Sequence, residues 1–90
     1  MAMAALKIKI MPESPETDLD EIKNSASCEI EKLGGKLHNH EIQPIAFGLN
    51  ALILTVMWPE HQDLDLIENA ITKISGVNSV EVIDFRRAIG

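Results

Sequence analysis

The feature that most limits what this chain can fold into is a repeat. The letters M-P-E are followed by D-L-D-E-I-K-N at positions 18–24, and the letters W-P-E are followed by D-L-D-L-I-E-N at positions 63–69. The two seven-residue segments agree at five positions. A cap and an acidic first turn suit the start of any helix, so the likeness has a local explanation as well. The repeat nevertheless indicates that one strand–helix–strand unit is used twice.

Apolar periodicity places the elements around this repeat. Alternating or continuous apolar runs predict strands, and apolar residues at three- and four-residue steps predict helices. Strands are expected at 6–10, 37–42, 49–58 and 77–87, and helical stripes at 19–33 and 67–74. The segment at 49–58 is almost continuously apolar, which is typical of a central strand, whereas 37–42 is polar, which favours an edge.

Local signals refine these elements. Asp18 followed by Glu21 predicts a capped helix start, and Gly34-Gly35 and Gly76 are suited to helix ends. The alternation in the last strand slips between Val82 and Ile83, which predicts a bulge or a strand covered on both faces.

The order β-α-β-β-α-β predicts an α+β fold, the ferredoxin-like two-layer α/β sandwich. Right-handed crossovers put both helices on one face of an antiparallel sheet with strand order 4-1-3-2. We expect a single domain over residues 1–90, with a core of aliphatic side chains because aromatic residues make up only 3% of the chain. The other face of the sheet is expected to be open to solvent or to a partner.

Charge and composition exclude several classes of function. The net charge of −6 argues against direct binding of nucleic acid and is compatible with a basic protein partner. The absence of a long apolar run argues against a membrane span, and one cysteine, Cys28, permits no internal disulfide. We therefore expect a cytoplasmic protein.

No residue pattern supplies catalytic or cofactor chemistry. His38 and His40 would point the same way on a regular strand, but three or four ligands are usually needed for a metal, so we expect no metal site and no cofactor. Cys28 lies one position from the apolar stripe of the first helix and is interpreted as a partly buried thiol. The protein is therefore not expected to be an enzyme.

Three longer segments, read together, resemble one family. They are K-I-K-I-M-P-E-S-P, E-I-Q-P-I-A-F-G-L-N-A-L-I-L-T-V and G-V-N-S-V-E-V-I-D-F-R-R-A-I. In order and spacing they are similar to the archaeal translation elongation factor 1-beta family, from about Leu6 to the end of the chain. The resemblance implies the ferredoxin-like fold and guanine-nucleotide exchange on the translation GTPase elongation factor 1-alpha, which carries the GDP or GTP and the Mg²⁺. It also implies the archaeal form, which has no region before the exchange domain.

The resemblance also implies partner-binding residues. The Pro-Ile-x-Phe-Gly element maps onto Pro44, Ile45, Phe47 and Gly48, and the basic residue that reaches the partner's magnesium site maps onto Arg86 or Arg87. The chain departs from the family pattern with arginine instead of lysine at the C-terminal position. It also has Asn50-Ala51 where relatives often carry lysine.

Two questions stay open at the level of sequence. The ring of Phe47 would by default be in the core, since large apolar side chains usually are, whereas the resemblance favours an exposed anchor. Two other functions are compatible with the fold: a regulatory domain that binds a small molecule, and a structural module associated with the ribosome.

Overall fold

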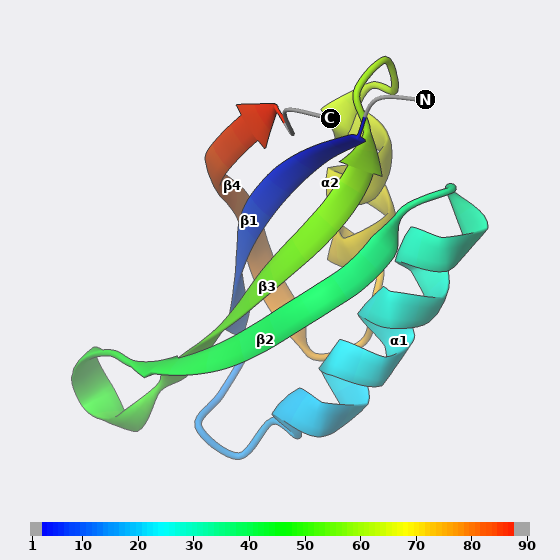
Figure 1. Ribbon diagram of the computed structural model, residues 1–90. Coiled ribbons are helices and arrows are strands. Elements are labelled where there is room, and N and C mark those ends of the chain that lie inside the picture. The colour runs from blue at the N-terminus through cyan, green and yellow to red at the C-terminus, as the bar shows by residue number, and fades with distance from the viewer. Residues whose placement is uncertain (1–2, 88–90) are drawn as a thin grey trace.

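The computed structural model describes residues 3–87 and has the element order β-α-β-β-α-β (Figure 1). The strands are β1 (Met3–Pro12), β2 (Lys36–Pro44), β3 (Asn50–Pro59) and β4 (Val77–Arg87). The helices are α1 (Leu19–Lys32) and α2 (Leu64–Thr72), and a short 3₁₀ turn, η1 (Ala46–Gly48), joins β2 to β3. The predicted order of elements is confirmed.

The four strands form one antiparallel sheet in the order β2-β3-β1-β4, which is the predicted order 4-1-3-2 counted from the other edge. Both helices pack against the same face of this sheet (Figure 1). The polar strand β2 lies at one edge and β4 at the other. The fold is the ferredoxin-like α+β sandwich.

The core lies between the sheet and the helix layer and is built almost entirely of aliphatic side chains. Alternate residues of β1 and β3 face it, so Leu6, Ile8 and Ile10 are fully buried, and Trp58 is the one aromatic residue of the cluster. The helices contribute a second set of buried side chains: Ile22, Ala26, Ile30, Ile67 and Ile71. Among the described residues no polar or charged residue is buried.

Side-chain caps begin both helices. The Asp18 carboxylate accepts hydrogen bonds from the backbone N–H groups of Asp20 and Glu21, at 3.0 and 3.3 Å, as the sequence predicts. Asp63 does the same for Asp65 in α2, at 3.0 Å. The shared D-L-D motif is therefore a shared helix start. The apolar stripe at 67–74 predicts a helix that extends too far at its C-terminal end. The helix α2 ends at Thr72, and Ile74 lies in the following turn.

Bulges interrupt both edge strands. In β4, Lys7 pairs with Asp84 but Ile8 pairs with Val82, so Ile83 is the extra residue, and the predicted bulge is confirmed. In β2, Leu37 and Asn39 pair with successive residues of β3, which leaves His38 as the extra residue. In the described part of the chain, no helix has the length and apolar character needed to cross a bilayer.

Candidate functional site

The β2–β3 hairpin extends from the body of the molecule as an arm that ends in a tight loop (Figure 1). The last pair of the ladder joins Pro44 to Asn50. Beyond it, the N–H of Ile45 donates a hydrogen bond of 2.8 Å to the carbonyl of Leu49, and the N–H of Leu49 donates one of 3.3 Å to Ala46. These two backbone hydrogen bonds close the loop. We call residues 44–49 the arm tip.

Phe47 is the most unusual residue of the arm tip. Its side chain is 94% exposed, and its φ and ψ of 63° and 29° lie in the left-handed region, which costs a residue with a Cβ roughly 1–2 kcal/mol. Gly48 follows with φ of 75°, which glycine adopts without strain. The core placement that composition alone favours is therefore wrong. A large ring held outside the core on a strained backbone is typical of a contact with a partner.

The residues at the C-terminal end of β4 lie at the opposite end of the sheet. Arg86 pairs with Ala5, which pairs in turn with Met57 of β3. Its guanidinium Nε is 3.2 Å from a carboxylate oxygen of Asp84, and its side chain is 80% exposed. Arg87 pairs with Ala4 through its backbone, and its side chain lies outside the described part of the structure.

The structure therefore brings the predicted site residues together in two groups, not one. Pro44, Ile45, Phe47 and Gly48 form the arm tip. Arg86 shares a cross-strand row with Ala5 and Met57, and Met57 is seven residues further along β3 than Asn50. At about 3.3 Å per residue this separation is roughly 23 Å. Figure 1 shows the β2–β3 loop and the end of β4 at opposite ends of the sheet.

Three further apolar residues on the edge strands are exposed, and none of them is among the predicted site residues. Ile42 on the arm is 52% exposed, and Ile83 and Phe85 lie partly exposed on β4. Ile42 extends the apolar surface of the arm beyond the tip. Its signal in the sequence was a large aliphatic residue in the second half of a mostly polar strand at a sheet edge.

The two histidines of β2 do not form a metal site. The bulge at His38 breaks the alternation of the strand, so the two imidazoles do not share the regular i, i+2 arrangement. Both are exposed, and no group of three or more His, Cys, Asp or Glu side chains among the described residues could hold a metal ion. Cys28 is exposed on α1, so its interpretation as a partly buried thiol is wrong.

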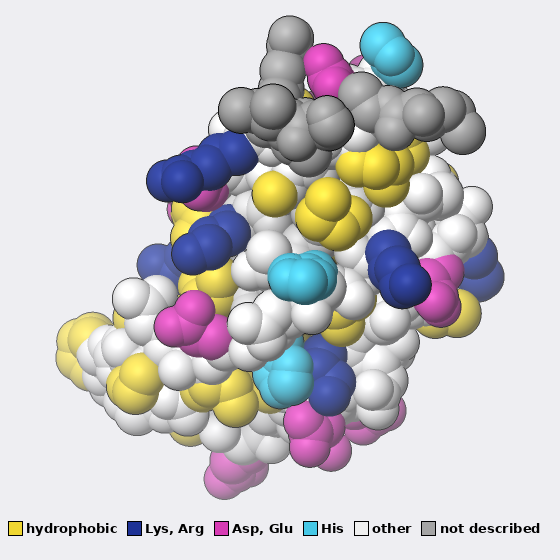
Figure 2. Space-filling model, viewed as in Figure 1, with side chains coloured by type: hydrophobic (Ala, Val, Ile, Leu, Met, Phe, Trp, Pro, Cys, Tyr) yellow, Lys and Arg dark blue, Asp and Glu magenta, His cyan; other side chains and the backbone are white. Residues whose placement is uncertain are grey.

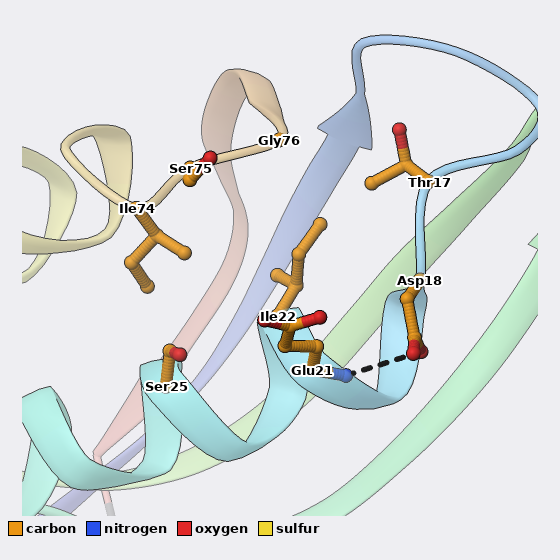
Figure 3. Close-up of a pocket in the computed structure, with 8 residues that line it drawn as sticks. All are labelled: Thr17, Asp18, Glu21, Ile22, Ser25, Ile74, Ser75 and Gly76. Atoms are coloured by element: carbon orange, nitrogen blue, oxygen red, sulfur yellow. Dashed lines mark hydrogen bonds between the residues drawn. The ribbon is translucent and has the colours of Figure 1, made fainter.

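A hollow of about 240 Å³ lies between the start of α1 and the turn after α2 (Figure 3). Its polar lining includes Thr17, Asp18, Glu21 and Ser75. The Asp18 carboxylate already accepts the two backbone hydrogen bonds of the helix cap. The volume is below the roughly 300 Å³ at which pockets for small molecules begin, so the hollow does not favour a small-molecule regulatory function.

The fold and its surface define a ferredoxin-like α+β domain with an arm whose tip is apolar and exposed. Residues 5–88 match the family model described as the EF-1 guanine nucleotide exchange domain. The chain is 45% identical over 89 residues to elongation factor 1-beta of Methanosarcina barkeri, covering 97% of this chain and 99% of that protein. It is 38% identical to the protein of that name from Natronomonas pharaonis, at 97% and 99% coverage. For the protein of that name from Saccharolobus solfataricus the identity is 39% and the coverage 89% of each chain. The chain belongs to the EF-1 guanine nucleotide exchange domain family.

Proposed function

We propose that this protein accelerates the release of GDP from elongation factor 1-alpha and so allows that GTPase to reload with GTP. The family membership supports exchange as the activity. The observation that carries the proposal is Phe47, an aromatic ring at the tip of a closed arm, 94% exposed and on a strained backbone. Such a ring has no role in the core of this chain and is suited to anchoring a protein partner.

An exchange factor changes no covalent bond, so its effect is a difference in binding. It binds the GTPase in a state that holds nucleotide poorly, and by linkage the nucleotide weakens the binding of the factor to the same extent. A thousandfold acceleration of GDP release corresponds to about 4 kcal/mol of barrier. The binding free energy of the factor is the source of that reduction.

The two groups of site residues divide this work. The arm tip, with Pro44, Ile45, Phe47 and Gly48, provides affinity, and the basic end of β4, with Arg86 and Arg87, disturbs the Mg²⁺ and phosphate contacts of the partner. Arg86 must leave Asp84 to do so. An ion pair this exposed contributes about 0–1 kcal/mol, so its release costs little.

The spacing of the groups fits one factor that contacts the GTPase at two places. With roughly 23 Å of sheet between them, the tip and the basic end cannot both enter a single nucleotide pocket. The tip therefore binds a region of the GTPase away from the phosphates. This assignment makes binding and exchange separable by mutation.

The decisive test is the release of fluorescent GDP from the cognate GTPase, with and without this protein. We expect saturating protein to accelerate release at least a hundredfold, and no acceleration would contradict the proposal. A variant truncated after Phe85 should keep most of the affinity for the nucleotide-free GTPase and lose most of the acceleration. Release at the undiminished rate with that variant would exclude the role of the basic end.

A further inference from the structure

The charges of this protein are divided between its two faces. Cross-strand partners share a face of a sheet, and Leu6, Ile8 and Ile10 face the helices, so Lys7, Lys9 and their partners lie on the open face. Only three of the fourteen acidic residues are on that face: Glu41, Glu81 and Asp84. The other eleven are on the helices and the connecting loops. The molecule thus has an acidic helix layer and an open face that is not acidic.

The positive charge is concentrated in one half of the open face. Two neighbouring cross-strand rows form this half, which we call the basic half-face: Arg86, Ala5, Met57, Lys36 in one row and Asp84, Lys7, Thr55, Asn39 in the other. It contains three cations and one carboxylate. Figure 2, in the same view as Figure 1, shows both basic and acidic side chains on the visible side of the molecule.

A hollow of about 190 Å³ opens on the basic half-face. It is lined by Ala5, Leu6, Lys7, Thr55, Asp84 and Arg86. Ala5, a small residue, lies between Arg86 and Met57 in its cross-strand row. Two cations, one carboxylate and a hydroxyl group thus surround a space smaller than the pockets that hold drug-sized ligands.

We propose that the basic half-face is a docking surface for acidic side chains of the GTPase partner, one of which enters the hollow between Lys7 and Arg86. The inference rests on the proposed function and adds to it the middle part of the interface. The surface connects to the basic end of β4 through Arg86. Charge complementarity of this kind raises the rate of encounter and sets the orientation of approach, while the acidic helix layer is repelled by the same partner surface.

The features of the half-face favour a protein partner over nucleic acid. Among the described residues the open face has no aromatic side chain on which a base could stack, because Trp58 is buried in the core and Phe85 pairs with Leu6, which faces the helices. The Asp84 carboxylate lines the hollow and repels a row of phosphates. A single carboxylate of a protein partner can still pair with Lys7 and Arg86, which line the same hollow. The net charge of −6 also opposes a polyanion.

The test compares two double variants with the same change in net charge. Lys7→Glu with Lys36→Glu reverses the basic half-face, and Lys23→Glu with Lys73→Glu reverses two lysines of the helix layer. Stopped-flow association with the GDP-bound GTPase at low ionic strength should be slowed about tenfold by the first pair and less than twofold by the second. The difference should shrink at physiological salt, where the Debye length is about 8 Å. Equal slowing by both pairs would overturn the proposal.

A third variant keeps the proposal testable if the Lys7→Glu, Lys36→Glu double variant does not fold. Asp84→Asn removes the carboxylate that competes for Arg86, so it should accelerate association about twofold to fivefold, and an unchanged or slower rate contradicts the proposal. A separate experiment titrates the protein with unacylated tRNA, and we expect no binding at micromolar concentration. Salt-sensitive tRNA binding that the first double variant abolishes would assign the surface to nucleic acid. If the wild-type protein binds the GTPase but does not accelerate GDP release, the proposed function fails while the docking surface stands.

Discussion

The indole N–H of Trp58 donates a hydrogen bond of 3.1 Å to the backbone carbonyl of Gln62. The side-chain amide of Gln62 in turn donates a hydrogen bond to the carbonyl of Leu33, at the end of α1. The end of the central strand β3 is therefore joined to the end of the first helix through a loop residue. This link also gives the buried indole a partner for its one polar atom.

Substitution of Gln62 by alanine should destabilise the fold without affecting exchange. The substitution leaves the Trp58 bond, which uses the Gln62 backbone, and removes the bond to Leu33, so we expect a loss of about 1 kcal/mol in the free energy of unfolding. Urea denaturation followed by Trp58 fluorescence measures it. A change below 0.3 kcal/mol would show that the bond contributes nothing net.

Two substitutions at Phe47 should separate stability from binding. Phe47→Ala removes an exposed ring, so the free energy of unfolding should change by less than about 0.5 kcal/mol while affinity for the GTPase falls at least tenfold. Phe47→Gly should lose the same affinity but raise stability by up to about 1 kcal/mol, because glycine adopts the left-handed conformation without strain. Both quantities come from urea denaturation and equilibrium titration. A loss of stability in either variant would mean that the ring packs against the arm.

Replacing Gly35 or Gly48 by alanine should lower the free energy of unfolding by different amounts. A Cβ at Gly35 would lie 2.9 Å from the Met57 carbonyl oxygen and 2.9 Å from a ring carbon of Trp58, so Gly35→Ala should cost about 1–3 kcal/mol. A Cβ at Gly48 would meet nothing within 4 Å, and only its φ of 75° opposes alanine, at about 1 kcal/mol. Thermal and urea unfolding of both variants tests the order. Equal costs would indicate that the backbone at Gly35 moves to accept the methyl group.

The two capping aspartates of the repeat allow a direct comparison of the same substitution at both helix starts. Asp18 accepts two backbone N–H groups and Asp63 accepts one, so we expect Asp18→Ala to cost about 1 kcal/mol and Asp63→Ala less. Because both carboxylates are exposed caps, neither variant should alter the exchange rate. Slower GDP release in Asp18→Ala at full folding would instead assign a function to the hollow beside it.

Much of the fold could be predicted from the sequence because the repeat and the two periodicities agree. The slip between Val82 and Ile83 located a bulge, and D-L-D located both caps. The predictions that failed have a common cause, because the features that they missed depend on strand register and on packing at the margin of the core. The bulge at His38 leaves no signal in a polar edge strand, and Ile74 continues the apolar stripe although the helix has ended.

The separation of the site residues follows from topology and was missed in the sequence analysis. In the order 4-1-3-2, the turn between the second and third strands and the end of the fourth must lie at opposite ends of an antiparallel sheet. The exposure of Phe47 was less accessible, because it depends on a left-handed backbone that phenylalanine rarely adopts. The resemblance to a family favoured it where the residue type alone did not.

The unbroken strand β3 has a mechanical consequence. It is paired along its whole length, from Asn50 beside the arm tip to Pro59 beyond the buried Trp58. The backbone pairing of β3 therefore sets the distance along the sheet between the arm tip and the end of β4. A protein that bound both places would have to match this distance.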